Sequence, residues 1–271
     1  MKPILILATN QDHYEGYDIP TGLWLGELTH FIHIMEEKGI PFKIASLKGG
    51  EIPLDPYSLS EQFMDEQTLP YYDDLRFMSE LVNSQSLDKL NPENYSAIYF
   101  AGGHGAMYDF VQDPRAAQWI LAMTKMQKPV AAVCHGVAAL TNQALEIDDQ
   151  VFVEGKTVTG YTNAEELHVG HSDHVPFLLQ DRLQRLGANF GEAGPFQSHV
   201  QLEGCLLTGQ NPQSTKELAE TLADMLLGEA EWLSVFTAAF YLFLGFWVSA
   251  CNSTSTDRAC SSITPFFPTL P

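Results

Sequence analysis

Basic residues are scarce in this chain of 271 residues: 14 Lys and Arg stand against 34 Asp and Glu, a formal net charge of −20. Binding to the polyanionic backbone of nucleic acids depends on clustered Lys and Arg that displace counterions, so we expect no nucleic-acid partner. The same imbalance disfavours attachment to anionic lipid by charge. The apolar content of 45% argues against disorder and for a globular protein.

The sequence also lacks a recognisable cysteine pattern, and we expect no signal peptide. The four cysteines are Cys134, Cys205, Cys251 and Cys260. Their spacing is neither close nor regular, which indicates neither a disulfide framework nor a zinc knuckle. The apolar run at residues 4–8 is too short for a signal peptide. We therefore expect a reducing, cytoplasmic environment for residues 1–231.

Charge is nearly absent from the end of the chain. In residues 232–271 only Asp257 and Arg258 are charged, so we expect an acidic domain at 1–231 followed by an apolar tail. Residues 232–251 carry no charge and are long enough to cross a hydrocarbon core of roughly 30 Å as a helix. This segment is either a membrane anchor, and then the chain's one contact with a membrane, or a buried helix or extension that the domain does not need.

The rest of the chain alternates short β-rich runs with segments of helical periodicity, which favours an α/β fold with a mostly parallel sheet covered by helices. Strands are expected at 3–8, 42–47, 95–100 and 129–133, and helices at 22–38, 74–84, 116–127, 176–186 and 213–227. Hairpins are expected to pair 151–153 with 157–159, and 200–202 with 205–208. Residues 49–94 are acidic and rich in Pro and Tyr, and we interpret them as an insertion that shapes or covers a pocket, as a lid does.

The most informative segment is a buried β run at 129–133 that meets a helical run of small residues at Cys134. This layout is typical of a nucleophile elbow, where a strained turn between strand and helix presents the nucleophile to a cleft. The small Ala132 and Gly136 allow the backbones to approach closely. A helix N-terminus lowers the pKa of a thiol, so we expect a reactive thiolate; the alternative is a buried structural cysteine.

A glycine-rich loop at 102–105, Gly-Gly-His-Gly, follows the expected strand 95–100. Because strands of one parallel sheet end at the same edge, the N–H groups of this loop are expected to converge on the elbow. Together with the N–H of His135 they would stabilise an oxyanion. The side chain of His104 either lines the substrate pocket or caps the loop.

Five segments carry a family resemblance: Gly-Gly-His-Gly (102–105), Ala-Val-Cys-His-Gly (132–136), Glu27 in the first expected helix, Thr-Gly-Tyr-Thr-Asn-Ala-Glu-Glu (159–166) and Thr-Gly-Gln-Asn-Pro (208–212). Together they resemble the ThiJ/PfpI superfamily, and within it the heat-shock chaperone-like, glutathione-independent glyoxalase (glyoxalase III) branch. The resemblance covers about residues 3–228 and not the tail. It implies a flavodoxin-like α/β three-layer sandwich, to which the tail adds an apolar C-terminal extension.

The resemblance also implies roles for individual residues. Cys134 would be the nucleophile and His135 its partner in proton transfer. Glu166 would orient the histidine, with its neighbour Glu165 as the alternative, since a shift of one residue in alignment exchanges them. Glu27 matches a carboxyl that hydrogen-bonds the cysteine. The N–H groups of Gly103 and His135 would hold the oxyanion.

The implied reaction converts methylglyoxal and similar 2-oxoaldehydes to 2-hydroxy acids such as lactate, through a hemithioacetal on the cysteine. No cofactor or metal is expected, because the proton shift between adjacent carbons is an internal redox exchange. The expected partner is a small carbonyl substrate. The same branch also implies a holdase chaperone that binds unfolded client proteins, and a homodimer is a further candidate assembly.

Two other chemistries remain open for the same cysteine. One is hydrolysis of an amide or peptide, although the late His-x-Glu pair of glutamine amidotransferases is missing after the elbow. The other is oxidation sensing by the thiol. Two groups at three-residue spacing are weaker candidates for metal ligands than for surface or pocket residues: Glu27, His30 and His33, and His168, His171, Asp173 and His174.

Overall fold

The apolar runs predicted as strands form the middle of a seven-stranded sheet in the computed structural model, which describes residues 1–147 and 150–228. The sheet order is β10-β11-β5-β4-β1-β2-β3, and each pair is parallel except β10 with β11. Its strands are β1 (Ile4–Ala8), β2 (Phe42–Ser46), β3 (Gln85–Ser86), β4 (Ala97–Phe100), β5 (Val130–Val133), β10 (Val200–Glu203) and β11 (Leu206–Gly209). β1, β4 and β5 are buried along their whole length, as expected where helices cover both faces.

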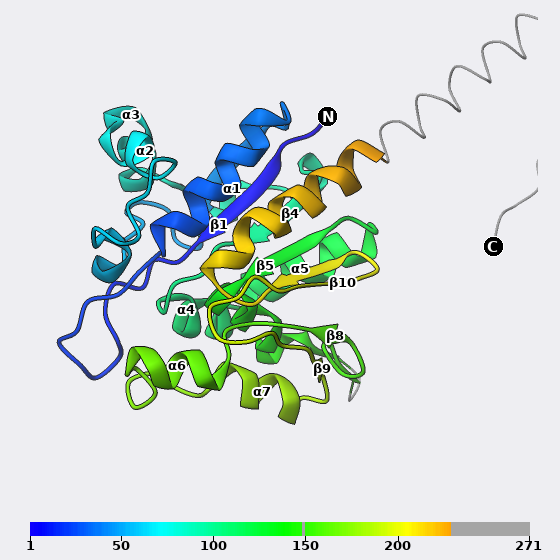
Figure 1. Cartoon of the computed structure of the whole chain (residues 1–271). Coiled ribbons are helices and arrows are strands. Elements are labelled where there is room, and N and C mark those ends of the chain that lie inside the picture. Colours follow the sequence, from blue (N-terminus) through cyan, green and yellow to red (C-terminus); the bar gives the residue numbers. More distant parts are fainter. Residues whose placement is uncertain (148–149, 229–271) are drawn as a thin grey trace, which may run out of the picture. The chain divides into compact units, whose positions relative to one another are not determined.

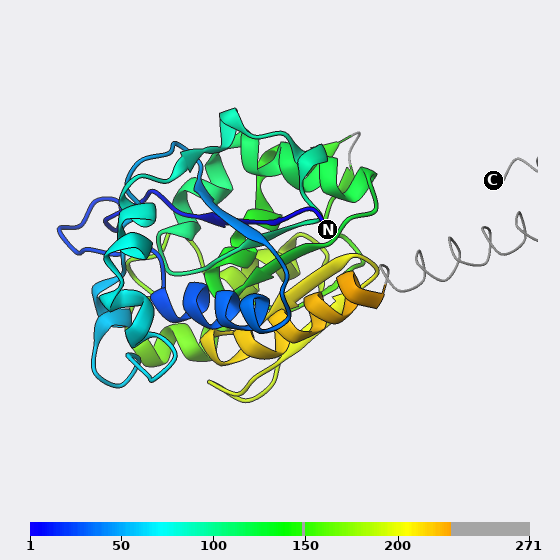
Figure 2. The same ribbon diagram turned by 90° about the horizontal axis from the view of Figure 1, so that it is seen from above.

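Helices lie on both faces of this sheet. On one face are α1 (Leu25–Glu37) and the helical residues 215–228, side by side, and on the other are α4 (Ala106–Gln112) and α5 (Pro114–Lys125) (Figures 1 and 2). The arrangement is the flavodoxin-like three-layer sandwich that the family resemblance implied. α1 follows the predicted periodicity, since its buried side chains point at the sheet, and it ends before Gly39, which has a φ of 66°.

Shorter elements surround the carboxyl ends of the strands. The insertion carries a 3₁₀ helix (Pro56–Leu59), α2 (Leu69–Asp73) and α3 (Leu75–Val82). After β5 come a 3₁₀ helix (Cys134–Thr141), α6 (Asn163–Val169) and α7 (Leu179–Arg185). Figure 1 places α6 and α7 together, next to the short strands β8 (Thr157–Val158) and β9 (Asn189–Phe190).

One predicted hairpin is wrong and the other is confirmed. Residues 151–153 do not pair with 157–159: β7 (Gln150–Val151) is antiparallel to β6 (Glu146–Ile147), while β8 is parallel to β9. The turn at Gly155 therefore does not join paired strands, because β7 before it pairs with β6 and β8 after it pairs with β9. The hairpin of β10 and β11 forms as predicted around Gly204, whose φ of 60° suits a tight turn.

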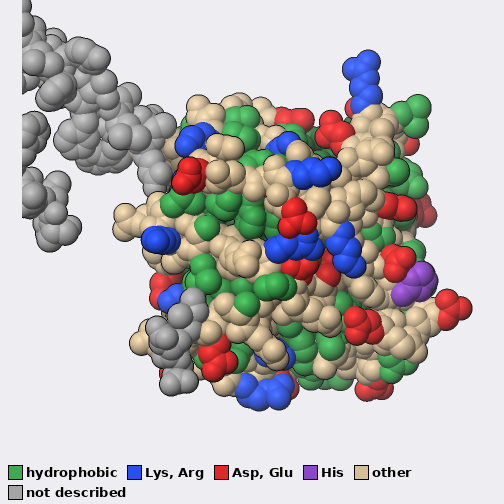
Figure 3. Space-filling view, turned by 180° about the vertical axis from the view of Figure 1, so that it is seen from behind, with side chains coloured by type: hydrophobic (Ala, Val, Ile, Leu, Met, Phe, Trp, Pro, Cys, Tyr) green, Lys and Arg blue, Asp and Glu red, His purple; other side chains and the backbone are tan. Residues whose placement is uncertain are grey.

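The residues Met1–Leu227 form one compact unit. The expected domain boundary at 231 and the apolar tail with its membrane-anchor hypothesis lie outside the described residues. Within 1–147 and 150–228, no helix combines the length and the apolar character needed to cross a membrane. On the face of the molecule in Figure 3, Lys and Arg side chains are scattered among acidic and apolar ones.

Candidate active site

Cys134 stands at the junction of β5 and the 3₁₀ helix, and its backbone has the strain expected of an elbow. Its φ is 55°, an uncommon value for a residue with a Cβ, and its side chain is almost fully buried. The close packing around the turn requires Gly136, because a Cβ there would lie 2.3 Å from the carbonyl oxygen of Phe100 in the neighbouring strand. The predicted elbow is confirmed, although the helix that follows it is 3₁₀ rather than α.

A chain of contacts links the thiol to one buried carboxylate. Cys134 Sγ lies 3.3 Å from His135 Nδ1, and His135 Nε2 lies 2.8 Å from Glu166 Oε2. The other carboxylate oxygen, Oε1, is 2.8 Å from His104 Nε2. One carboxylate therefore holds two imidazole rings, whose centroids are 4.0 Å apart. The bond to His104 was not anticipated from the sequence.

The two neighbouring glutamates of α6 face different groups. Glu165 closes the N-terminus of the helix in a capping box with Thr162, and its Oε1 accepts hydrogen bonds from the Phe196 N–H at 2.8 Å and from Asn211 Nδ2 at 2.7 Å. Glu166, one residue on, points to the histidines. The geometry thus brings Glu166, and not Glu165, to His135.

The histidines determine the charge of Glu166. Burial alone would raise the pKa of this carboxyl, but the electrostatic interaction with His135 and the hydrogen bonds from both imidazoles hold the pKa well below its usual range. Burial, together with the nearby His135, lowers the pKa of His104. The carboxylate is therefore the stable form of Glu166, and His104 favours its neutral form.

Glu27 reaches the site from the first turn of α1. Its Oε2 accepts a hydrogen bond from the Gly102 N–H at 2.7 Å. Its Oε1 is buried and has no hydrogen-bond partner of good geometry among the described residues. Burial raises the pKa of Glu27 to about 8, partly offset by its interaction with Cys134 and the Gly102 N–H. At neutral pH the protonated acid therefore predominates, and it can donate to a sulfur anion.

The expected low pKa of the thiol is wrong. Burial raises the pKa of Cys134 well above its ordinary value, and the interaction with the adjacent Glu27 raises it further, against the lowering effect of the His135 N–H. An elbow lowers a thiol pKa through its N–H groups, but here desolvation of the sulfur is the larger effect. The resting site therefore holds a thiol that loses its proton when a base takes it.

The loop at 102–105 lies beside the elbow, as its place after β4 predicted. Gly103 has a φ of 103°, and a Cβ there would lie 2.2 Å from the carbonyl oxygen of Gly22. Its N–H donates to no group within the described residues, while the N–H of Gly102 is taken by Glu27. The Gly103 amide is thus available to a ligand, and the His135 N–H already approaches the sulfur.

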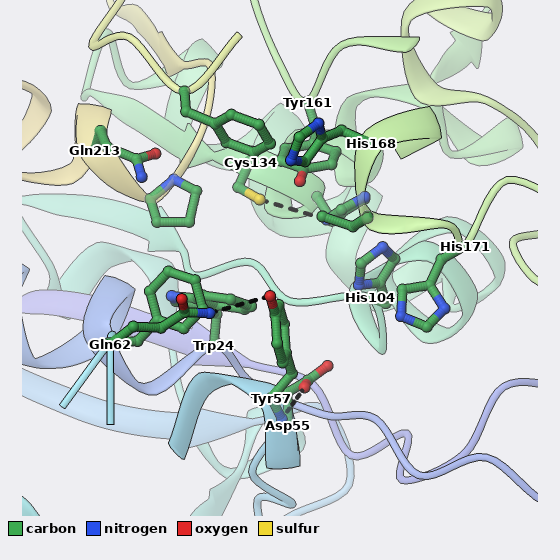
Figure 4. A pocket seen from close by; sticks show the side chains of 15 residues that line it. Trp24, Asp55, Tyr57, Gln62, His104, Cys134, Tyr161, His168, His171 and Gln213 are labelled. Carbon is green, nitrogen blue, oxygen red and sulfur yellow. Dashed lines mark hydrogen bonds between the residues drawn. The ribbon is translucent and has the colours of Figure 1, made fainter. Parts of the chain in front are cut away.

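A cavity of about 230 Å³ opens above these groups (Figure 4). Cys134, Tyr161, His168 and Gln213 lie on one side in the view, and Trp24, Tyr57 and Gln62 lie opposite, with His104 and His171 beside them. The insertion contributes lining residues Asp55, Tyr57, Gln62 and Phe63. Tyr161 belongs to the 159–166 motif, and its ring centroid lies 4.4 Å from that of His135, a contact that the sequence does not predict.

Neither of the two weaker histidine groups forms a metal site within the described residues, although His171 Nδ1 and His174 Nδ1 lie 3.4 Å apart. Glu27 faces the interior, whereas His30 Nε2 lies 2.8 Å from Asp65 Oδ2 in the insertion. His168 lines the cavity, and His171 stacks on Tyr14 with 5.1 Å between ring centroids. Among the described residues, the group with ligand atoms close enough for a metal ion is His104, His135 and Glu166, and its members are already paired to one another.

Comparisons with known proteins place this fold in a family. The profile of the DJ-1/PfpI family matches residues 25–225. The chain belongs to the DJ-1/PfpI family. Among its curated relatives is Glyoxalase 3 of Candida albicans, 25% identical over 227 residues, or 81% of this chain and 96% of that protein. Another is the glutathione-independent glyoxalase HSP31 of Saccharomyces cerevisiae, 24% identical over 232 residues, or 83% and 98% of the two chains.

The solved structures include a protein with higher sequence identity to this chain. The Rapid Encystment Protein 24 kDa of Francisella tularensis is 38% identical, with a TM-score of 0.79 over 83% of this chain and 99% of that chain. The two proteins therefore share their fold over most of this chain.

Proposed function

We propose that this protein is a cofactor-independent glyoxalase that converts methylglyoxal and similar 2-oxoaldehydes to 2-hydroxy acids through a hemithioacetal on Cys134. The observation that carries the proposal is the contact chain from the Cys134 sulfur through His135 to Glu166, beside the buried acid Glu27. The names of the glyoxalase relatives support the same reaction. We propose further that the enzyme is a lyase whose site consists of Cys134, His135 and Glu166.

The first step forms the bond between sulfur and carbon. His135 Nδ1, 3.3 Å from the sulfur, takes the thiol proton, and the Glu166 carboxylate stabilises the resulting imidazolium. The thiolate adds to the aldehyde carbon, and the oxygen becomes negative near the N–H groups of Gly103 and His135. Protonation of this oxygen gives the hemithioacetal.

The second step moves a proton from the former aldehyde carbon to the adjacent ketone carbon. A base removes the proton to give an enediol, and an acid returns one to the neighbouring carbon, so the first carbon is oxidised and the second is reduced. Glu27 and His135 are the candidates for this exchange. Water then cleaves the thioester, which releases the 2-hydroxy acid and restores the thiol.

The test is methylglyoxal turnover by the full chain without glutathione, with the product identified as lactate. We expect Cys134→Ala to abolish lactate formation while its circular dichroism and melting temperature stay close to those of the wild type. Addition of a metal chelator should leave the rate unchanged. A well-folded wild-type chain that forms no lactate would refute the proposal.

A holdase function is a second candidate, favoured by one observation on the insertion. Leu69, Leu75 and Val82 on α2 and α3 are 43%, 84% and 51% exposed. Exposed apolar side chains of this size are suited to unfolded clients. We expect Leu75→Asp to weaken suppression of client aggregation, measured by light scattering, and Cys134→Ala to leave it unchanged; no suppression by the wild type would remove this candidate.

A further inference from the structure

The cavity above Cys134 is larger than methylglyoxal needs. Its volume is about 230 Å³, whereas an apolar cavity of roughly 150 Å³ holds a benzene molecule. Methylglyoxal has fewer non-hydrogen atoms than benzene and would leave much of the space unfilled. The side chains around the remaining space therefore indicate what else the site accepts.

One wall of the cavity is a cluster of three aromatic rings. Trp24 precedes α1, and Tyr57 and Phe63 come from the insertion. Their ring centroids are 4.8 Å apart for Trp24 and Phe63, 5.3 Å for Tyr57 and Phe63, and 6.0 Å for Trp24 and Tyr57, each pair edge to face. Such a cluster offers ring faces and edges to a flat apolar group.

The other wall contains a strained aromatic residue. Phe196 has a φ of 59°, a conformation that is unfavourable for a bulky side chain, and its ring lies 5.1 Å from that of His168. Its N–H is held by the buried Glu165 at 2.8 Å. A glycine would adopt this backbone without strain. The fold therefore tolerates strain at a position whose phenylalanine ring lines the cavity.

The polar reactive groups are gathered at one end of the same cavity. The Cys134 sulfur and the imidazoles of His104 and His135 lie together, and the sulfur faces the open space in Figure 4. A ligand that uses the whole cavity thus needs a small polar head at the thiol and a flat apolar group between the aromatic walls.

We propose that the cavity is an aryl-binding site, and that its substrates are 2-oxoaldehydes with an aromatic or similarly bulky apolar group on the ketone carbon. This inference rests on the proposed glyoxalase function. For phenylglyoxal the steps balance as for methylglyoxal: sulfur adds to the aldehyde carbon, a proton passes to the carbon that bears the ring, and water releases mandelate with the thiol restored.

A purely structural role for the aromatic rings predicts a different result. If Tyr57 serves only to attach the insertion to α1, its removal affects small and large substrates equally. If it contacts the apolar group, its removal affects the large ligand selectively. The informative quantity is therefore the ratio of affinities, or of kcat/KM values, for an aryl ligand and its methyl counterpart. A general loss of structure lowers both values and cancels in this ratio.

The first experiment measures binding without turnover. In the full chain with Cys134→Ala, calorimetric titration compares mandelate with lactate, which share a carboxylate and differ in the apolar group. We expect mandelate to bind about tenfold more tightly or better, as burial of a phenyl ring predicts. Adding Tyr57→Ala should reduce this preference to about threefold or less.

The matched control is Tyr72→Ala, a tyrosine of the same insertion that is 38% exposed and does not line the cavity. It should leave the preference unchanged. Equal affinities for mandelate and lactate, or equal losses of both on Tyr57→Ala, would overturn the aryl-binding site.

The second experiment measures turnover in the chain with Cys134 intact. We expect Tyr57→Ala to lower kcat/KM for phenylglyoxal about five- to tenfold more than for methylglyoxal. An equal fall for both substrates would overturn the inference and leave the glyoxalase proposal standing. A chain that turns over neither substrate would refute the glyoxalase proposal, and the binding comparison would still decide the aryl site.

Discussion

The two sides of the cavity are built in different ways. The reactive side consists of buried residues fixed by short contacts, with Cys134 at the carboxyl end of the interior strand β5 and Glu166 held between two histidines. The opposite side belongs to the insertion, where Tyr57 is 49% exposed and stands on a single 3₁₀ turn. The residues that we propose for the chemistry are thus buried and tightly hydrogen-bonded, whereas the aromatic wall that we propose for the rest of a substrate includes residues of an exposed loop, where sequence change is better tolerated.

The strongest test of the rigid side is Glu166→Gln, which keeps the shape of the side chain and removes its charge. The imidazolium formed in the first step would lose its counter-charge, and one amide cannot accept from both rings through two oxygens. We expect kcat/KM for methylglyoxal to fall by about 10³- to 10⁴-fold. Steady-state kinetics on the folded variant measure this, with Glu165→Gln as the control.

Glu165→Gln should lose stability rather than chemistry, because Glu165 bonds Thr162, Phe196 and Asn211 instead of a histidine. If Glu165→Gln lowers kcat as much as Glu166→Gln does, the assignment of Glu166 to His135 is wrong.

A second test uses the pH dependence of stability. Burial raises the pKa of Glu27 from 4.5 to about 8 in the folded chain, so the folded state keeps this proton where the unfolded state has released it. Stability therefore falls as pH rises from about 4.5 to about 8, by up to about 5 kcal/mol from this group. Urea unfolding at several pH values should show this fall relative to Glu27→Gln, and parallel curves for the two proteins would contradict it.

A third, smaller effect is expected at His104. His104→Leu leaves Glu166 Oε1 buried without a partner, which costs about 1–3 kcal/mol. We expect kcat/KM for methylglyoxal to fall about ten- to a hundredfold, and His104→Gln, whose amide can donate to the same oxygen, to recover most of the loss. Both variants losing activity equally would mean that the imidazole itself, rather than its hydrogen bond, is required.

The smallest effect is expected on the insertion. Tyr57→Phe keeps the ring and removes the hydroxyl that accepts a hydrogen bond from Gln62 Nε2 at 3.0 Å. This bond is exposed, so we expect a change in unfolding free energy within about 0.5 kcal/mol and methylglyoxal turnover within about twofold of wild type. A larger loss in thermal unfolding would show that the insertion is as rigid as the reactive side.

Features with a local cause could be predicted from the sequence. β1, β4 and β5 were found because buried parallel strands are continuously apolar, and the elbow was found because the turn needs small residues around Cys134. The helix α6 was missed although Thr162 and Glu165 form a capping box, which is a readable start signal.

Features that depend on distant parts of the chain could not be predicted. The mistaken hairpin at 151–159 arose because β8 pairs with β9, some thirty residues further on, as the register of Thr157 with Asn189 shows. The bond between His104 and Glu166 and the raised pKa of Cys134 depend on burial and on Glu27, which only the folded chain brings together.

The position of Glu166 has a consequence for protein synthesis. It is 31 residues after His135 and 62 after His104 along the chain. A growing chain emerges from its N-terminus and closes these loops only after α6 has been made. The nascent polypeptide therefore carries its thiol and both histidines before the carboxylate that pairs with them, and the buried contact chain is complete only when the later segment docks.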